Sequence, residues 1–348
     1  MKLIKNVFGK LPDGSDVYLY TIVNESMEIS LTNYGCIITS LKVLDRNDDL
    51  GEVVLGFDKL ESYLKPHPYF GAIVGPVANR ISGAKYVFNN EEISLDANEG
   101  KNQLHGGSMG FDKTLWREVS IVEDENFIQV NLAYLRPDGL MGYPGNLDFK
   151  FSMTVYKNNR IDLNYFGTTD KSTPVNITHH DYFNLTDGGG TNILDHLVMI
   201  SAKKYTPTKD DKCVTGEIIS VNKSPFDFSS FKKVGTGIKE LYGEISAKNG
   251  IDHNFVLSGE SPIAATVRCD ISKRQLEIYT NKRCVQFYAS NHLDGSLGRI
   301  DQEFKAFHAL CLETQSFPDA VNHNNFPSVI LNADEEYDYF TSYVFSTF

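Results

Sequence analysis

One carboxylate interrupts an apolar run near the end of the chain. The run reads HALCLETQSFPD, from His308 to Asp319, and Glu313 stands in its middle. A carboxylate that is fixed by packing and partly shielded from water can act as a general base. An acid on an edge strand that faces water would leave the same pattern, so Glu313 alone does not decide the chemistry.

Two adjacent histidines form a second candidate group. They lie in VNITHHDYFNLTDGGG (175–190), whose closing glycines are typical of a turn at a strand end. Side chains alternate along a strand, so His179 and His180 must face opposite ways. One of them can face a site while the other faces the interior. For either histidine taken alone, a purely structural role is the competing interpretation.

Four further polar residues lie beside turns: Arg80 in VANRISG, His105 in NQLHGG, Asp252 in NGIDHNFVL and Gln286 in CVQFYASNHLDG. The arginine fork suits hydroxyl and carboxylate recognition. A surface ion pair would also explain Arg80, and an acid that caps a turn would also explain Asp252.

Two other kinds of site are less well supported. His105, His179, His180 and Glu313 have the residue types of metal ligands, but no local ligand spacing recurs, so we expect no metal. GGSMG (106–110) matches the nucleophile elbow of serine hydrolases, which needs a helix after it. Strand-like alternation follows instead, so a hydrolase is not favoured.

The elements that must position these residues are mostly strands. Alternation with a period of two, or dense β-branched residues, marks the segments 16–24, 27–33, 36–44, 126–135, 148–156, 160–166, 264–270, 274–280 and 284–290. Residues 85–95 predict a hairpin at Asn89-Asn90. Helices are expected only at 57–65 and 229–243. This pattern predicts an all-β fold, a sandwich or barrel, as one domain over residues 1–348.

The composition narrows the class of partner. The 348 residues carry a net charge of −12, which disfavours nucleic acid and anionic membranes. The N-terminus has no signal-like apolar core, and no apolar run is long enough to span a bilayer. Five cysteines are scattered without a C-x-x-C pair, which indicates reduced thiols and a cytoplasmic protein. The sequence does not report the oligomeric state.

Seven motifs in a fixed order carry a family resemblance. They are VANRISGAKYVFN, NQLHGGSMGFDKTLW, DGLMGYPGNL, VNITHHDYFNL, GIDHNF, VQFYASNHLDG and LETQSFPDAVNH. Together they resemble the galactose mutarotase (aldose 1-epimerase) family. The resemblance implies a large antiparallel β-sandwich with few short helices. It also implies that a monosaccharide, an aldohexose such as galactose or glucose, is interconverted between its α and β anomers without a metal or an organic cofactor.

The resemblance also implies residue roles. The glutamate of LETQ, Glu313, matches the family's catalytic base. The histidine before x-Y-F-N-L matches its catalytic acid and is His180, not His179. Substrate-binding positions match Asn79, Arg80, His105, Asp252 and Gln286, and we expect Tyr182 to pack on the sugar. The chain departs from the common family pattern at Pro76, His179 and His292, which leaves the preferred sugar open.

Ring opening needs a base for the C1 hydroxyl and an acid for the ring oxygen. A free histidine is mostly neutral at pH 7, so we expect Asp252 or Glu313 to hold His180 protonated. Three alternatives stay open: a carbohydrate-binding protein without catalysis, a glycosidase with Asp252 and Glu313 as its carboxylate pair, and an epimerase of phosphorylated hexoses. The last would need more basic residues around the site than these motifs contain.

Overall fold

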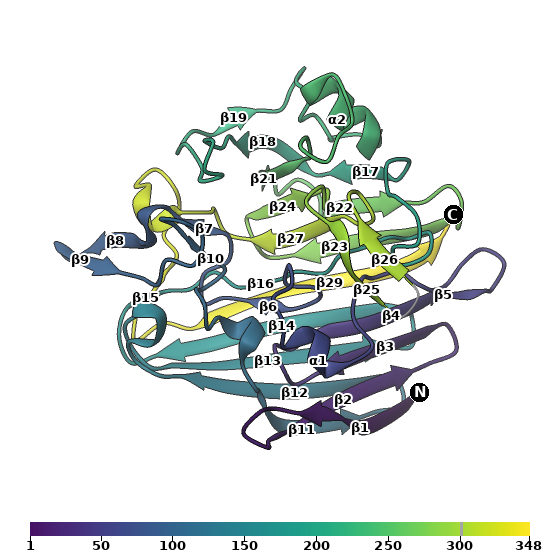
Figure 1. Cartoon of the computed structure of the whole chain (residues 1–348), viewed down its shortest axis with the longest axis horizontal. Coiled ribbons are helices and arrows are strands. Elements are labelled where there is room, and N and C mark those ends of the chain that lie inside the picture. Colours follow the sequence, from purple (N-terminus) through teal and green to yellow (C-terminus); the bar gives the residue numbers. More distant parts are fainter. Residues whose placement is uncertain (300–301) are drawn as a thin grey trace.

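The largest sheet of the described structure has nine antiparallel strands (Figure 1). The computed structural model describes residues 1–299 and 302–348. In spatial order the strands are β11 (Arg117–Glu123), β12 (Phe127–Arg136), β13 (Leu147–Tyr156), β14 (Arg160–Thr169), β29 (Tyr337–Thr347), β23 (Arg274–Thr280), β22 (Ile263–Arg268), β17 (Leu197–Ile200) and β20 (Lys232–Lys233).

Two five-stranded sheets complete the architecture. The first runs β1 (Lys2–Lys10), β2 (Asp16–Val23), β3 (Met27–Thr32), β4 (Ile38–Leu44) and β5 (Leu50–Glu52). The second has the order β19 (Ile219–Ser220), β18 (Ala202–Thr206), β21 (Asp252–Leu257), β24 (Cys284–Tyr288) and β27 (Cys311–Gln315). All the strand pairs in these sheets are antiparallel.

The period-two pattern of the sequence is the cause of this layering. On β13, Leu147, Phe149 and Phe151 are buried, while the intervening Asp148 and Lys150 are exposed. One face of the large sheet is therefore apolar and has to be covered. A single hydrophobic cluster joins it to inward-facing residues of both five-stranded sheets. The prediction of a large antiparallel β-sandwich is confirmed.

Short strand pairs bring the connecting segments together. They are β7 (Arg80–Ile81) with β10 (Gln103–Leu104), β6 (Ile73–Val74) with β16 (Thr178–His179), β8 (Lys85–Phe88) with β9 (Glu91–Ser94), β15 (Thr173–Pro174) with β28 (Ile330–Leu331), and β25 (Asp294–Arg299) with β26 (Gln302–Lys305). The predicted hairpin at Asn89-Asn90 is confirmed: both residues have positive φ, 52° and 65°, as a tight hairpin turn requires.

The helices are shorter than predicted. The segment 57–65 forms only α1 (Leu60–Tyr63), because Pro66 and Pro68 follow and disfavour helical backbone before them. In 229–243, Lys232–Lys233 join the large sheet as β20, and the helix α2 covers only Val234–Tyr242. Short 3-10 turns occur at Ser82–Ala84, Phe111–Lys113, Leu140–Gly142 and Ala320–Asn322.

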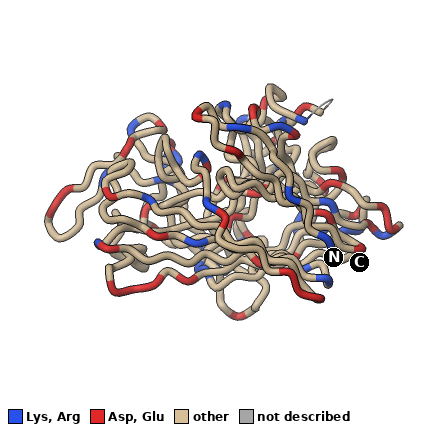
Figure 2. The backbone as a smooth tube through the Cα atoms, turned by 90° about the horizontal axis from the view of Figure 1, so that it is seen from below, with Lys and Arg blue, Asp and Glu red and all other residues tan. Residues whose placement is uncertain are grey.

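The surface carries both signs of charge. Acidic and basic residues are interspersed along the tube of Figure 2. Across residues 1–299 and 302–348, no helix has the length and apolarity needed to cross a membrane.

Candidate active site

Polar side chains from three neighbouring strands, β21, β24 and β27, share one face of their sheet, which we call the polar floor. Gln286 on β24 lies directly opposite Glu313 on β27 and Asn254 on β21. Side chains two apart share a face, so Gln315 and Asp252 join them. Gln286 donates to Asp252 at 2.7 Å, and Gln315 donates to Asn254 at 3.0 Å. The opposite face of the same strands is apolar and joins the core, which fixes the polar face outward from that core.

Glu313 lies on an edge strand but does not face water. β27 ends the strand order of its sheet, yet Glu313 is only 2% exposed. The segment that contains β16 packs over it. Of the two interpretations of HALCLETQSFPD, the structure therefore supports the packed, shielded carboxylate.

Two glycine-flanked loops bring in the next residues. The β7–β10 pair sets Leu104 opposite Arg80, so the next residues outward, His105 and Asn79, also meet. The His105 amide donates to the carbonyl of Asn79 at 3.0 Å, and the Asn79 amide donates back to Nδ1 of His105 at 3.1 Å. Gly106 makes this turn possible: its φ is +90°, and a Cβ there would meet the Gly75 carbonyl oxygen at 1.9 Å.

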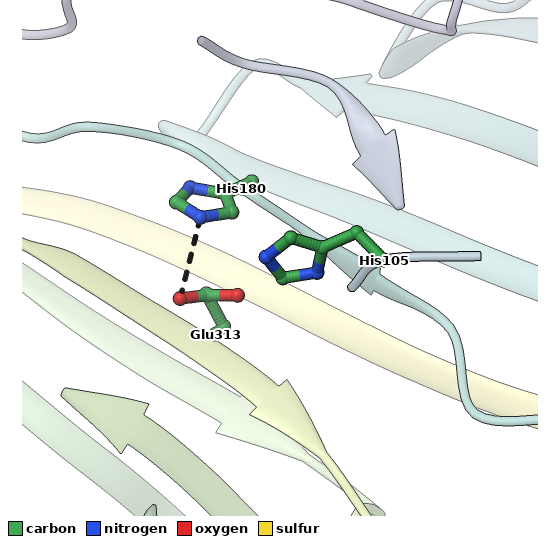
Figure 3. Close-up of side chains that lie close together, drawn as sticks. All are labelled: His105, His180 and Glu313. Carbon is green, nitrogen blue, oxygen red and sulfur yellow. Dashed lines mark ion pairs between the residues drawn. The ribbon is translucent and has the colours of Figure 1, made fainter. Parts of the chain in front are cut away.

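The two adjacent histidines do face opposite ways. His179 points into the interior, where its ring is stacked near Phe151. His180 points at the polar floor, and its Nε2 lies 3.6 Å from Oε1 of Glu313 (Figure 3). One ligand atom from each of His180, Glu313 and His105 lies within 4.8 Å of the others.

Burial dominates the acid–base properties of this cluster. It raises the pKa of Glu313 well above its usual value, the nearby Asp252 carboxylate adds to the rise, and Arg80 opposes it. Burial lowers the pKa of His180 to about 4, against smaller opposing effects that include Asp181 and Asp252. Burial therefore opposes the expectation that a carboxylate holds His180 protonated. The low-dielectric surroundings favour the uncharged form of each group.

The hydrogen bonding of His105 makes it a donor toward the pair. Its Nδ1 accepts the Asn79 amide, so the hydrogen of the neutral ring is on Nε2. Burial also lowers the pKa of His105 well below its usual range. In Figure 3 its ring lies beside Glu313. A nitrogen that carries hydrogen binds a hydroxyl oxygen rather than a metal ion, so His105, His180 and Glu313 suit a sugar better than a metal.

Arg80 is held by a neighbouring acid. Its Nε and Nη2 donate to the two carboxylate oxygens of Glu99, each at 2.6 Å. Arg80 and Asp252 are half-buried, in contrast to the buried His180 and Glu313.

The comparison with known proteins now decides the family. A family model described as aldose 1-epimerase matches residues 18–344. The chain belongs to the aldose 1-epimerase family. Members are isomerases, and the chain is 41% identical over 350 residues to the galactose mutarotase of Bos taurus, with 99% of each chain covered. It is 34% identical over 340 residues to the aldose 1-epimerase of Escherichia coli K12, with 96% of each covered.

Solved structures agree with this assignment. The crystal structure of galactose 1-epimerase from Lactobacillus acidophilus superimposes with a TM-score of 0.87 at 26% identity and covers 99% of both chains. An aldose epimerase homologue from Caenorhabditis elegans gives the same TM-score at 27% identity and covers 94% of this chain and 98% of its own.

Residues predicted from several of the motifs lie together in this candidate site. Glu313, His180 and His105 form its centre, Asn79 holds His105, and Asp252 and Gln286 are hydrogen-bonded to each other. Tyr182 differs from expectation in what it touches. It is 1% exposed, its hydroxyl donates to Pro68 at 2.9 Å, and its ring stacks on His180 with centroids 5.0 Å apart.

Sequence reasoning missed several neighbours of the candidate site. The ring of Tyr69 lies 4.6 Å from that of His105, and Tyr69 follows two prolines in a turn that has no periodic signal. Glu99 lies in a loop of ordinary polar composition. Asn254 and Gln315 are inside the motifs DHNF and LETQ, and strand alternation would have placed them beside Asp252 and Glu313.

The serine of GGSMG lacks the surroundings of a nucleophile elbow. Ser108 is exposed, its hydroxyl contacts the sulfur of Met141, and a single 3-10 turn follows in place of the helix that the elbow requires.

Proposed function

We propose that the chain interconverts the α and β anomers of an aldohexose, with Glu313 as the base and His180 as the acid. The observation that carries the proposal is the distance of 3.6 Å between Nε2 of His180 and Oε1 of Glu313. The C1 hydroxyl and the ring oxygen of a hemiacetal are bonded to the same carbon. A base and an acid placed this close together can therefore serve both oxygens at once.

The single proton of the pair sets the order of events. In the sugar-free site the uncharged form, protonated Glu313 with neutral His180, is favoured by burial. Transfer of that proton to His180 gives a carboxylate and an imidazolium without changing the net charge. A bound sugar favours this form, because its C1 hydroxyl donates to the carboxylate and its ring oxygen accepts from the imidazolium.

Ring opening then moves two protons. Glu313 removes the C1 hydroxyl proton while His180 gives its proton to the ring oxygen, and the C1–O5 bond breaks to leave an open-chain aldehyde. This step returns the pair to its uncharged form. Rotation about C1–C2 presents the other carbonyl face, and the same steps in reverse close the ring as the other anomer.

The surrounding residues bind the sugar in this proposal. His105 donates from Nε2, and Arg80 uses the guanidinium nitrogen that Glu99 leaves free. Gln286 and Asp252 bind further hydroxyls of the sugar. Asn79 orients His105, and Tyr182 supports the ring of His180 from behind. These donors stabilise charge that develops on the sugar oxygens.

Galactose and glucose are the proposed substrates. The galactose mutarotase and galactose 1-epimerase names of the relatives support galactose. The departure His292 is exposed and stacks on Tyr288, 6.2 Å away between centroids, so it can touch only the rim of the site.

All five cysteines are buried and free, which supports a reducing, cytoplasmic setting.

Polarimetry tests the proposal. Freshly dissolved α-D-galactose and α-D-glucose are followed by optical rotation with and without the protein. We expect faster relaxation to the same equilibrium rotation, first-order in enzyme concentration, with at least one of the sugars. A rate equal to that of buffer with both sugars would refute the proposed substrates.

A further inference from the structure

The residues on either side of His180 form a buried pair of their own. The side chains of His179 and Asp181 are each 1% exposed. Nδ1 of His179 lies 2.9 Å from Oδ2 of Asp181, and Nε2 lies 2.9 Å from the carbonyl oxygen of Cys36. The hydroxyl of Tyr343 donates to the same Asp181 oxygen at 2.8 Å.

These contacts determine where the hydrogens are. A backbone carbonyl is only an acceptor, so Nε2 of His179 must carry a hydrogen. Oδ2 of Asp181 already accepts the hydrogen of Tyr343, and an oxygen that accepts in this way is a poor place for a carboxylic proton. A hydrogen on Nδ1 of His179 would donate to Oδ2 and leave that oxygen free to accept from Tyr343. With hydrogen on both ring nitrogens, the ring would be an imidazolium and Asp181 a carboxylate.

We propose that His179 and Asp181 form a charged, buried ion pair that positions His180 from behind. The functional part of this inference rests on the proposed role of His180 as the acid. An asparagine at position 179 could not carry the charge.

The pair acts on both the position and the charge of His180. The His180 amide donates to Ala72 at 2.8 Å, and its carbonyl accepts from Gly71 at 3.1 Å. The backbone at His180 is therefore held by these two hydrogen bonds and by the buried side chains of His179 and Asp181 on either side. The carboxylate of Asp181 raises the pKa of His180, and His179 lowers it.

Other titratable groups also face these residues. Around His180 they are Glu313, Asp252, His105, Tyr69 and Tyr182. Around Asp181 they are Tyr343, Tyr165 and Cys311. Among the described residues in these two sets, none is a lysine or arginine, so His179 is the cation that balances Asp181.

Nitrogen NMR of the full chain with ¹⁵N-labelled histidine tests the charge state without any sugar or activity. At about pH 8 a free imidazole is neutral. His105 and His196 serve as internal references, because each accepts a backbone amide at one ring nitrogen and must show one bare nitrogen. We expect His179, identified by its loss in His179→Asn, to show two protonated nitrogens. A bare nitrogen at His179 would overturn the proposal.

The variant Asp181→Asn provides a second test if His179→Asn does not fold. Without the carboxylate, the buried ring of His179 should lose a proton, so a bare nitrogen should appear at about pH 8. Two protonated nitrogens in folded Asp181→Asn would show that Asp181 does not hold the charge, and the ion pair would be refuted.

The titration of His180 in the same spectra tests the positioning role. Removal of the His179 charge leaves the Asp181 carboxylate unbalanced, so the His180 midpoint should rise by about one pH unit in His179→Asn. The matched control, His196→Asn, removes a buried histidine elsewhere and should leave the midpoint unchanged. An unmoved midpoint in folded His179→Asn would reduce the pair to a structural element. None of these spectra depends on mutarotation, so failure of the proposed reaction would be seen separately.

Discussion

The carboxylate of Glu99 accepts two hydrogen bonds of 2.6 Å from the guanidinium of Arg80, one from Nε and one from Nη2. Among the described residues nothing else accepts from this fork, so Nη1 is left for a ligand. Glu99 thus fixes the direction in which Arg80 presents its free nitrogen.

Replacing Glu99 by glutamine should weaken sugar binding. The amide can accept only one of the two hydrogen bonds and brings its own NH₂ against the guanidinium. We expect KM to rise about tenfold with a smaller change in kcat, as for the loss of one charge-assisted hydrogen bond. Initial rates over a range of sugar concentrations measure both constants.

Glu92→Gln is the matched control for Glu99→Gln. Glu92 forms an ion pair with Lys85 that is exposed at both ends, 53% and 54%, and such pairs contribute little. Its KM should equal that of the wild type. A Glu99→Gln enzyme with the same KM as this control would show that Arg80 does not need its partner to bind sugar.

The two histidines should differ in their effect on the rate. His180→Asn removes the proposed acid, so kcat should fall by roughly 10² to 10⁴. His179→Asn leaves the acid in place, and its loss should be smaller. Polarimetric rates at saturating sugar compare the variants after their folding has been checked by circular dichroism. A larger loss in His179→Asn would reverse the assignment of the acid.

The pH profile of kcat/KM should be unusually broad. Activity needs the pair to hold one proton. As the pH falls through about 4, the lowered pKa of His180, a second proton binds and activity is lost. As the pH rises through the pKa of Glu313, which burial raises above its usual value, the last proton leaves and activity falls again. An acid limb near the ordinary histidine pKa of about 6.5 would contradict this account.

Arg136 should be essential to the stability of the DGLMGYPG loop. It is 1% exposed, and its guanidinium donates to five backbone carbonyls, those of Pro137, Leu140, Tyr143, Pro144 and Gly145. A lysine has three donors and no fork, so several carbonyls would be left buried without a partner. We expect Arg136→Lys to lower the free energy of unfolding by roughly 2–4 kcal/mol, measured by urea denaturation.

Arg117→Lys is the control for this prediction, because Arg117 is exposed on β11. Its free energy of unfolding should stay within about 0.5 kcal/mol of the wild type. An equal stability of both variants would show that the carbonyl contacts of Arg136 are replaced by water. The hydroxyl of Tyr143 donates to Gln103, two residues before His105, so Arg136→Lys should also reduce kcat/KM.

Much of the fold could be predicted because each long strand of the large sheet has one apolar face. The residues of β12, β13 and β14 alternate in the sequence for the same reason that they alternate in burial. Helices were overestimated where tertiary pairing decides the outcome. Lys232–Lys233 extend the large sheet as β20, which no local pattern indicates.

The candidate site could be predicted to the extent that its residues lie in ordered motifs. Glu313, His180 and Arg80 were found in this way, and strand alternation explains why only one histidine faces Glu313. Tyr69 and Glu99 come from irregular loops, where contacts depend on chain paths that the local sequence does not encode. The lowered pKa of His180 does not follow from the motif, because burial is a property of the assembled sheets.

The central claim is that the buried carboxylate of Glu313 is the base. Glu313→Gln keeps the shape of the side chain and removes the group that takes the proton. Optical rotation of α-D-galactose should relax with wild-type protein much faster than in buffer, and with Glu313→Gln at a rate roughly 10² to 10⁴ slower than wild type. Wild-type relaxation rates in a folded Glu313→Gln protein would contradict the account.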